Sequence, residues 1–247
     1  MSRRLRAQTR FELSLLARNG ENLLVSLAVP LGFLVFFAAV PLPGMASDPL
    51  DVLVPAVLTI ALMGSGLVAV GVSTAFEREQ GVLRRYRVSA LGTGELAAAK
   101  ALAIGLVQVV QVGVVLGGAV ALGWRPTPGV GGVALLLLAL PLASAAFAGI
   151  GLALAGALPA LRALAVINAV FLALILLGGA AVPRSLLPGP LALIAAATPT
   201  AQVIDLLTVA FRSATLASAG VLLGPVLTLL AWATLGWGLA VRLLPRE

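Results

Sequence analysis

The sequence predicts an all-α integral membrane protein with six transmembrane helices, an N-terminal amphipathic interfacial helix and a re-entrant helical hairpin before the last span. Two observations predict this class. Hydrophobic residues make up 61% of the 247 positions and charged residues only 10%, whereas soluble domains are nearly half apolar and a quarter charged. Apolar runs of about 20 residues also recur, each long enough as a helix to cross a hydrocarbon core roughly 30 Å thick. We therefore expect residues 1–247 to form one transmembrane permease domain.

The first 21 residues are basic and moderately amphipathic. Arg3, Arg6 and Arg10 fall on one helical stripe, while Phe11 and several leucines lie on the other side. This pattern predicts an interfacial helix over residues 1–21. A signal peptide is the alternative, but the basic region is long and contains two glutamates, and the apolar run after it exceeds a typical signal-peptide core. We expect this run to be retained as the first span.

The rest of the chain alternates apolar runs with short polar connections. The expected spans are about 23–40, 52–76, 101–122, 130–158, 165–182 and 217–241. Between the last two, Pro183, Pro188 and Pro199 interrupt an apolar stretch that cannot make one continuous crossing. We expect residues 183–213 to form an external re-entrant hairpin, which a membrane protein tolerates where the free backbone groups meet protein or water.

The positive charges predict the orientation. Six crossings put both termini on one side of the membrane, and of the 16 lysines and arginines only Arg125, Arg184 and Arg212 fall on the other side. The positive-inside rule then makes both termini cytoplasmic. Arginine far outnumbers lysine, and alanine and glycine are abundant, which fits a GC-rich bacterial genome. We therefore expect the protein in a bacterial plasma membrane. This placement explains the net charge of +7 by topology and attraction to anionic lipid, so we expect no nucleic-acid partner.

Several kinds of chemistry lack the residues they need. The chain contains no cysteine and no histidine, so it has no thiolate nucleophile and lacks the commonest metal ligand and general base. The phosphate loop of an ATPase requires Gly-Lys-Ser/Thr, whereas the one lysine, Lys100, lies between two alanines. We expect the chain to be no enzyme, to have no catalytic or metal site and to bind no cofactor itself.

Few polar side chains interrupt the expected spans. Gln108 and Gln111 share one face of the third span, and Asn168 lies near the start of the fifth. These amides either pack helices together through hydrogen bonds or line a translocation path, and packing is the favoured interpretation. No acid lies in mid-span, so Asp205 is the only candidate for a buried proton site.

The most charged segment follows the second span, at residues 77–91. Val82, Leu83 and Tyr86 gather on one helical face while the arginines project elsewhere. A short cytoplasmic helix here would offer an apolar ridge to a soluble partner. A solvated basic turn at the membrane edge is an equally good interpretation. The residues proposed for docking are Glu77, Arg78, Glu79, Gly81, Val82, Leu83, Tyr86 and Arg87.

Three features together point to a known family. The first is the segment after the second span, with Glu77-Arg78-Glu79, Gly81, Leu83, Arg87-Val88-Ser89 and Lys100. The second is the stretch from Gly178 through Pro183, Leu187-Pro188 and Thr198-Pro199 to Asp205. The third is six spans after a basic amphipathic helix. With these features the chain resembles the type-2 ABC exporter permeases, in particular the daunorubicin-resistance-like membrane subunits. It departs at Ala90, where the family often has proline, and at Thr208, where the family often has an arginine after the aspartate of the hairpin.

The resemblance implies a mechanism. Two permease copies or homologues would pair, and each would dock on a cytoplasmic ATP-binding-cassette ATPase that binds ATP and magnesium. Residues 77–91 would form the coupling helix and residues 3–20 an interfacial connecting helix. The cargo would be a hydrophobic or amphipathic drug, antibiotic or lipid moved outward, as in multidrug resistance, because few charges lie along the spans. A proton-coupled secondary transporter and a membrane lipid-modifying enzyme are the alternatives, and they would require a mid-span acid or an acid/base constellation.

Overall fold

The computed structural model describes residues 3–18, 20–40, 49–82, 93–181, 184, 187–212 and 219–244. These residues form helices joined by short connections and contain no strand. The expected all-α membrane class is confirmed. Among the residues singled out from the sequence, Leu83, Tyr86, Arg87 and Pro183 lie outside the described part of the chain.

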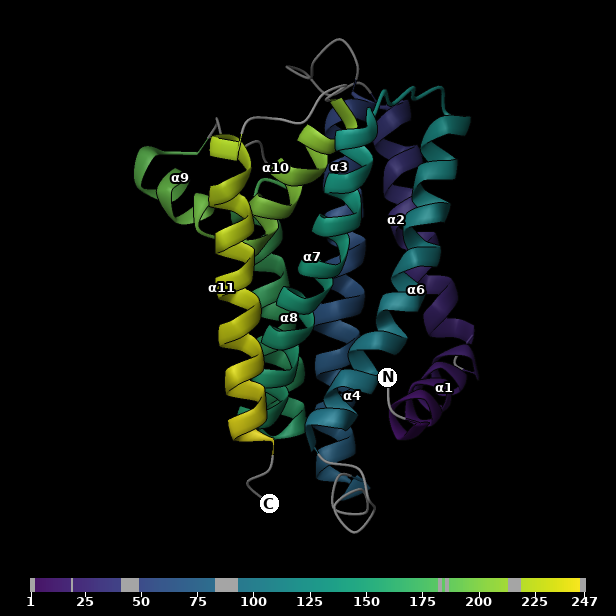
Figure 1. Cartoon of the computed structure of the whole chain (residues 1–247), viewed down its shortest axis with the longest axis vertical. Helices are drawn as coiled ribbons and strands as arrows, with labels where there is room; N and C mark the ends of the chain where they lie inside the picture. Colours follow the sequence, from purple (N-terminus) through teal and green to yellow (C-terminus); the bar gives the residue numbers. More distant parts are fainter. Residues whose placement is uncertain are drawn as a thin grey trace.

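Ten helical segments and one π-helix make up the described structure. In chain order they are α1 (Arg3–Arg18), α2 (Gly20–Ala39), α3 (Leu50–Met63), the π-helix η1 (Gly64–Ala69), α4 (Val70–Glu79), α6 (Thr93–Ala121), α7 (Val130–Ala157), α8 (Ala160–Leu177), α9 (Gly189–Ala196), α10 (Pro199–Arg212) and α11 (Ala219–Leu243). The long helices run roughly parallel in one bundle, while α1 crosses one end of it (Figure 1). We call the end that holds α1 and the last turns of α4 and α11 the basal end, and the end that holds α9 the hairpin end.

Five helices of the described chain are long and apolar enough to cross a membrane. They are Leu50–Glu79, Ala98–Ala121, Val130–Ala157, Ala160–Leu177 and Gly220–Leu243. The helices α9 and α10 bend by 76° at their junction and would bring the number to six if the pair counted as one span. The described apolar part of α2, Ser26–Ala39, is shorter, although α2 packs along α3 and α6 (Figure 1). The bent pair lies where the re-entrant hairpin is expected.

Several helices begin or end away from the expected span limits, and two of these differences bear on the site. The helix that contains the second expected span runs past residue 76 and carries its charged last turn without a break, as Leu50–Glu79. The helix that contains the fifth expected span begins at Ala160, directly after Pro159 at the N-cap. Proline is well suited to the start of a helix because its missing N–H would have no intrahelical partner there. Hydropathy marks the apolar middle of a span and misses such ends.

Glycines set the closest helix contacts, and α7 makes most of them. A Cβ added to Gly236 of α11 would lie 2.6 Å from the carbonyl carbon of Gly149 of α7, and one added to Gly151 would lie 2.5 Å from a carbonyl oxygen of η1. Small residues of this kind let helix backbones approach within a membrane, where packing replaces the hydrophobic effect. By contrast, Gly113 and Gly117, which have GxxxG spacing, face open space.

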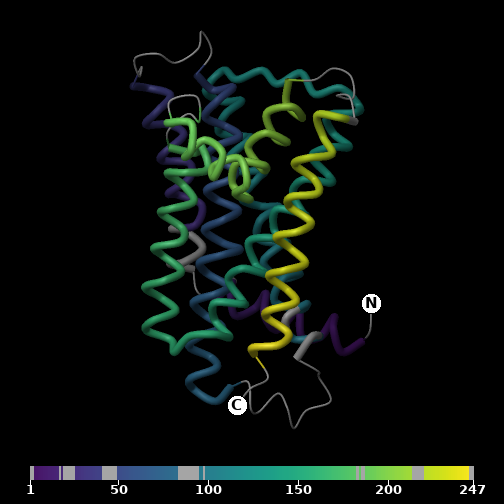
Figure 2. Tube along the Cα trace, turned by 90° about the vertical axis from the view of Figure 1, so that its left-hand side faces the viewer, coloured from purple at the N-terminus to yellow at the C-terminus, as the bar shows by residue number. Residues whose placement is uncertain are grey.

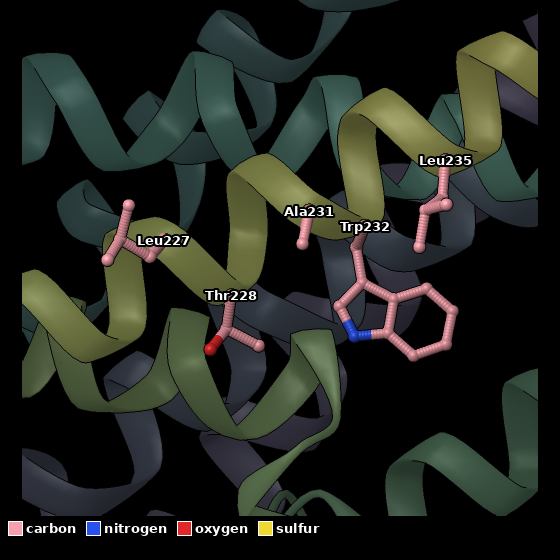
Figure 3. Close-up of a pocket in the computed structure, with 5 residues that line it drawn as sticks. All are labelled: Leu227, Thr228, Ala231, Trp232 and Leu235. Atoms are coloured by element: carbon pink, nitrogen blue, oxygen red, sulfur yellow. The ribbon is translucent and has the colours of Figure 1, made fainter.

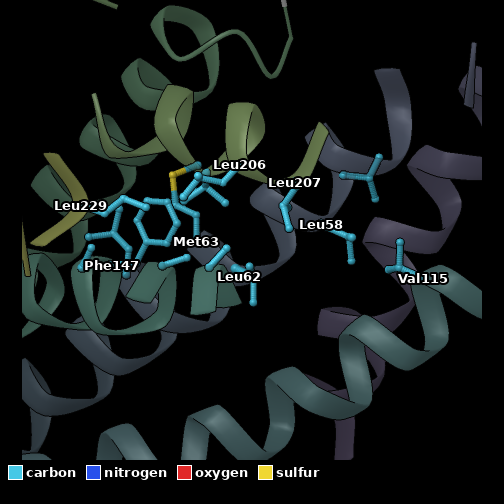
Figure 4. Close-up of a cluster of buried hydrophobic side chains, with 14 of the residues drawn as sticks. Leu58, Leu62, Met63, Val115, Phe147, Leu206, Leu207 and Leu229 are labelled. Carbon is cyan, nitrogen blue, oxygen red and sulfur yellow. The ribbon is translucent and has the colours of Figure 1, made fainter. Parts of the chain in front are cut away.

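The apolar core extends along the bundle on both sides of η1, and its largest side chains gather toward the hairpin end. Figure 4 shows side chains from α3, α6, α7, α10 and α11 meeting there. The largest fully buried members of the core include Leu58, Leu62, Met63, Phe147, Leu206, Leu207 and Leu229. Because α10 supplies buried leucines to this core, the second arm of the bent pair is packed into the bundle rather than lying on its surface.

Candidate functional site

The last turn of α4 is the junction of the basal end. Its three residues, Glu77, Arg78 and Glu79, each contact a different part of the fold. The helical spacing of 100° per residue points three successive side chains in three directions, so one turn can reach several neighbours. α4 ends at Glu79, with Gln80 as its C-cap, and Gly81 adopts a φ of 71°, which favours glycine.

Glu77 takes part in a buried ion network. The Lys100 Nζ of α6 donates to Glu77 Oε1 at 2.8 Å and to Glu12 Oε2 of α1 at 3.1 Å. Gln8 Nε2 donates to the other Glu12 oxygen at 2.8 Å. Lys100 and Glu12 are each only 6% exposed, so each charge depends on these partners to offset the cost of leaving water. The network therefore fastens α1 and α6 to the end of α4.

Arg78 covers the C-terminal end of α7. Its Nη1 donates to the carbonyl oxygen of Ala155 at 2.9 Å and to that of Gly156, and its Nη2 donates to that of Leu158 at 3.1 Å. The last carbonyls of a helix have no intrahelical donors and carry partial negative charge. The Arg78 guanidinium supplies hydrogen-bond donors to these carbonyls, and its positive charge interacts favourably with them.

Glu79 caps the start of α8. The backbone N–H of Ala160 donates to Glu79 Oε2 at 2.8 Å, and the N-cap residue Pro159 makes no side-chain hydrogen bond. A carboxylate at this position satisfies an unpaired amide and interacts favourably with the helix dipole. Through three consecutive side chains, the end of α4 thus holds α1, α6, α7 and α8 together. A displacement of this turn must move those four helices or break the contacts.

This arrangement changes one expectation about the charged segment. Glu77, Arg78 and Glu79 do not open a separate cytoplasmic helix but close the span-forming helix. Gly81 and Val82 follow in the connection and are partly buried. The docking surface expected at Leu83, Tyr86 and Arg87 falls on undescribed residues.

The π-helix lies midway along the same span and receives a side chain from α6. Gln108 Nε2 donates to the carbonyl oxygen of Leu62 at 3.1 Å and to Ser65 Oγ at 2.9 Å. A π-turn disrupts the regular ladder of backbone hydrogen bonds. The Gln108 amide donates to the carbonyl oxygen of Leu62, just before the π-helix. Gln111 Nε2 donates to the Ser26 carbonyl of α2 at 3.1 Å, while its buried Oε1 has no partner in the described chain. Both glutamines join helices through these hydrogen bonds.

Asn168 and the hairpin residues are placed elsewhere. Asn168 donates to the Leu164 carbonyl of its own helix at 2.8 Å and joins no other element of the described chain. Pro188 precedes α9, and Pro199 is the first residue of α10. Asp205 of α10 pairs with Arg184. This ion pair joins α10 to Arg184, which precedes α9, at the hairpin end.

A second cluster at the hairpin end was not expected from the sequence. The buried Trp124 donates from Nε1 to Asp51 Oδ1 at 2.9 Å, and Arg212 lies 3.2 Å from the other oxygen of that carboxylate. The Phe211 ring meets the Trp124 ring edge to face, with centroids 5.0 Å apart. This cluster fixes the start of α3 to the end of α10, at the end of the bundle opposite Lys100.

The bundle surface has a shallow apolar pocket along α11. Leu227, Thr228, Ala231, Trp232 and Leu235 line it (Figure 3). The Trp232 indole N–H donates to the carbonyl oxygen of Ala197 at 2.9 Å, which ties α11 to the bend between α9 and α10. In the described residues, no group of three or more acidic side chains is placed to hold a metal ion.

Residues 3–211 match the family model described as ABC-2 type transporter. The chain belongs to this family. No curated protein matches it in a sequence comparison. The ABC-2 chain is thus a permease, the membrane component of an ABC transporter, and the family implies in general an ABC ATPase as partner.

The central residues of the basal junction in this ABC-2 permease were only partly foreseen. The sequence drew attention to Glu77, Arg78 and Glu79 and to Lys100 as part of the same family signature, but it left Glu12 without a role and did not predict that Lys100 binds these acids. One signal was available. Lys100 is the single lysine and heads an apolar helix, and a lone cation in that position requires an acidic partner when buried.

Proposed function

We propose that this ABC-2 permease exports a hydrophobic or amphipathic compound, such as a drug, antibiotic or lipid. Two permease copies, or one copy and a homologue, would form the path. A separate ATP-binding-cassette subunit would bind ATP with magnesium and hydrolyse it, since this chain has no phosphate loop. The positive-inside rule places the basal end in the cytoplasm, where that subunit can reach it.

The observation that carries this proposal is the basal junction. The proposed docking segment, residues 77–91, begins in the turn whose side chains hold α1, α6, α7 and α8. A push delivered to Val82, Leu83, Tyr86 or Arg87 would pass through this turn into the bundle. Rigid side-chain contacts of this kind are the physical route by which a distant event moves packed helices.

The surface of the bundle supports a hydrophobic cargo and a second copy. Only 17% of the apolar window of α8, and 17% of that of α11, is buried within this chain. These helices therefore keep wide apolar surfaces for lipid, cargo or another permease. A strongly charged cargo would find few compensating groups there.

The test is ATP-driven transport in proteoliposomes that contain the permease and the ATPase encoded beside it. We expect ATP-dependent accumulation of a lipophilic dye, and we expect the double variant Leu83→Glu/Tyr86→Glu to insert normally but lose most of this transport while ATP hydrolysis continues. The matched control is Arg162→Gln/Arg242→Gln, which also changes the net charge by two but at α8 and α11, and should transport normally. Transport that persists without ATP, or without the ATPase, would contradict the proposal.

A further inference from the structure

Helix α1 presents three distinct faces. Gln8, Thr9 and Glu12 are 6–7% exposed and form the face turned toward the bundle. Phe11 and Leu15 are the apolar residues of a second face and are 48% and 44% exposed; the exposed Arg4 and Arg18 lie on the same face, near the two ends of the helix. The third face carries the exposed Arg3, Arg6 and Arg10. An isolated amphipathic helix would bury its apolar face, so this helix is built for surroundings that cover Phe11 and Leu15 from outside.

The position of α1 shows what those surroundings are. The helix runs across the bundle rather than along it (Figures 1 and 2). Glu12 binds Lys100, which lies near the N-terminal end of α6, where its apolar part begins. We expect this contact to hold α1 at the depth where the hydrocarbon core gives way to the headgroups. At that depth apolar side chains meet acyl chains while basic ones meet headgroups.

The arginine face lacks compensating charge among the residues that the structure describes. No carboxylate of the described residues pairs with Arg3, Arg6 or Arg10. The one acid on α1 in the described chain, Glu12, is turned away toward Lys100. The positive potential of this face is therefore directed outward, at headgroup depth.

We propose that Arg3, Arg6 and Arg10 form a binding surface for anionic phospholipid headgroups, with Phe11 and Leu15 seated among the acyl chains of the same lipids. Guanidinium groups bind phosphate through paired hydrogen bonds. A net negative headgroup is preferred over a zwitterionic one because each basic residue near an anionic surface favours binding about fivefold. Since Glu12 links α1 to Lys100 and Glu77, lipid bound here also steadies the basal junction.

The test uses the cysteine-free chain to place one fluorophore. Ser14 is exposed and borders the arginine face, so Ser14→Cys carries the label. The full-length permease is reconstituted in phosphatidylcholine vesicles with a small fraction of nitroxide-labelled phosphatidylglycerol or, in parallel, nitroxide-labelled phosphatidylcholine. We expect phosphatidylglycerol to quench several-fold more strongly, and we expect the preference to shrink at 1 M salt, where the Debye length falls to about 3 Å.

Variants separate the arginine face from the rest of the protein. Arg3→Gln/Arg6→Gln/Arg10→Gln should reduce the lipid preference at least about fivefold, and the three lysine substitutions at the same positions should keep most of it. Arg162→Gln/Arg242→Gln, which removes basic residues elsewhere, should leave it unchanged. If the triple glutamine variant does not insert, the salt dependence of quenching in the protein with all three arginines tests the proposal in its place.

Equal quenching by the two lipids in the unsubstituted protein at low salt would overturn the proposal. If the purified ATPase then also binds the triple glutamine variant more weakly, the arginines would be assigned to that protein instead. The lipid measurement needs neither ATP nor the ATPase, so its outcome is independent of the proposed export function.

Discussion

Replacing Lys100 with methionine is the most informative perturbation of the basal junction. Methionine keeps the length of the side chain and removes its charge, which leaves the carboxylates of Glu12 and Glu77 without their shared cation. Glu12 is 6% exposed, so its charge has no access to water. Removing one partner from a buried pair costs about 3–5 kcal/mol.

The two carboxylates contribute unequally to that cost. The Glu77 side chain is 25% exposed, so water stabilises its charge after the change and its share is smaller. Glu12 keeps one hydrogen bond from Gln8, which lowers the cost further. We expect Lys100→Met to reduce the free energy of unfolding by about 3 kcal/mol. Glu12→Gln alone should cost about 1 kcal/mol, because Lys100 keeps Glu77.

The assay is a double-mutant cycle of unfolding by sodium dodecyl sulfate in mixed micelles, followed by helical circular dichroism. The double variant Glu12→Gln/Lys100→Met should be more stable than Lys100→Met by about 2 kcal/mol, because it no longer buries an unpaired carboxylate. Thr9→Ala, at another buried position of α1, serves as the control and should couple weakly to Lys100. The reasoning is refuted if Lys100→Met is as stable as the unsubstituted protein, or if adding Glu12→Gln makes it less stable.

Three further predictions concern other contacts of the bundle. Arg78→Gln should lower the free energy of unfolding by about 2 kcal/mol by freeing carbonyls of α7, and hydrogen exchange should rise in the last turn of α7; no rise there would count against the capping role. Gln108→Leu should lower the free energy of unfolding in dodecyl sulfate by about 1 kcal/mol and should raise hydrogen exchange at the π-helix. The control Gln111→Leu should leave hydrogen exchange at the π-helix unchanged. Equal exchange in the two variants would show that Gln108 does not hold this segment. Gly236→Leu should destabilise by about 3 kcal/mol through overpacking against α7, and a crosslink between cysteines on α7 and α11 should weaken; an unaffected crosslink would rule out the close contact.

The class of the protein could be predicted from the sequence because lipid imposes a simple rule. Every span must be long, apolar and helical, so hydropathy alone locates most of α7 and α11. The proline pattern at Pro188 and Pro199 likewise predicts a broken helix pair. These features depend on local sequence, and the structure confirms the helical membrane class that they indicate.

The basal junction could not be predicted because it depends on which span ends meet. Glu12 lies on an amphipathic helix whose pattern gives this acid no partner, yet it is buried against Lys100 of another helix. Gly113 and Gly117 have the helix-contact spacing, whereas Gly149 and Gly236 make the contact. Hydropathy and spacing describe one helix at a time, and they do not record the partner against which a face packs.

The sidedness of the α4 end tests the account most directly. Gln80 is exposed directly after the charged turn, and a cysteine placed there would be the only one in the chain. We predict that Gln80→Cys resists a membrane-impermeant maleimide in intact cells, reacts in inverted membrane vesicles, and becomes protected there when the ATPase subunit is added. Labelling of this cysteine from the outside of intact cells would contradict the proposed coupling of ATP hydrolysis to the bundle.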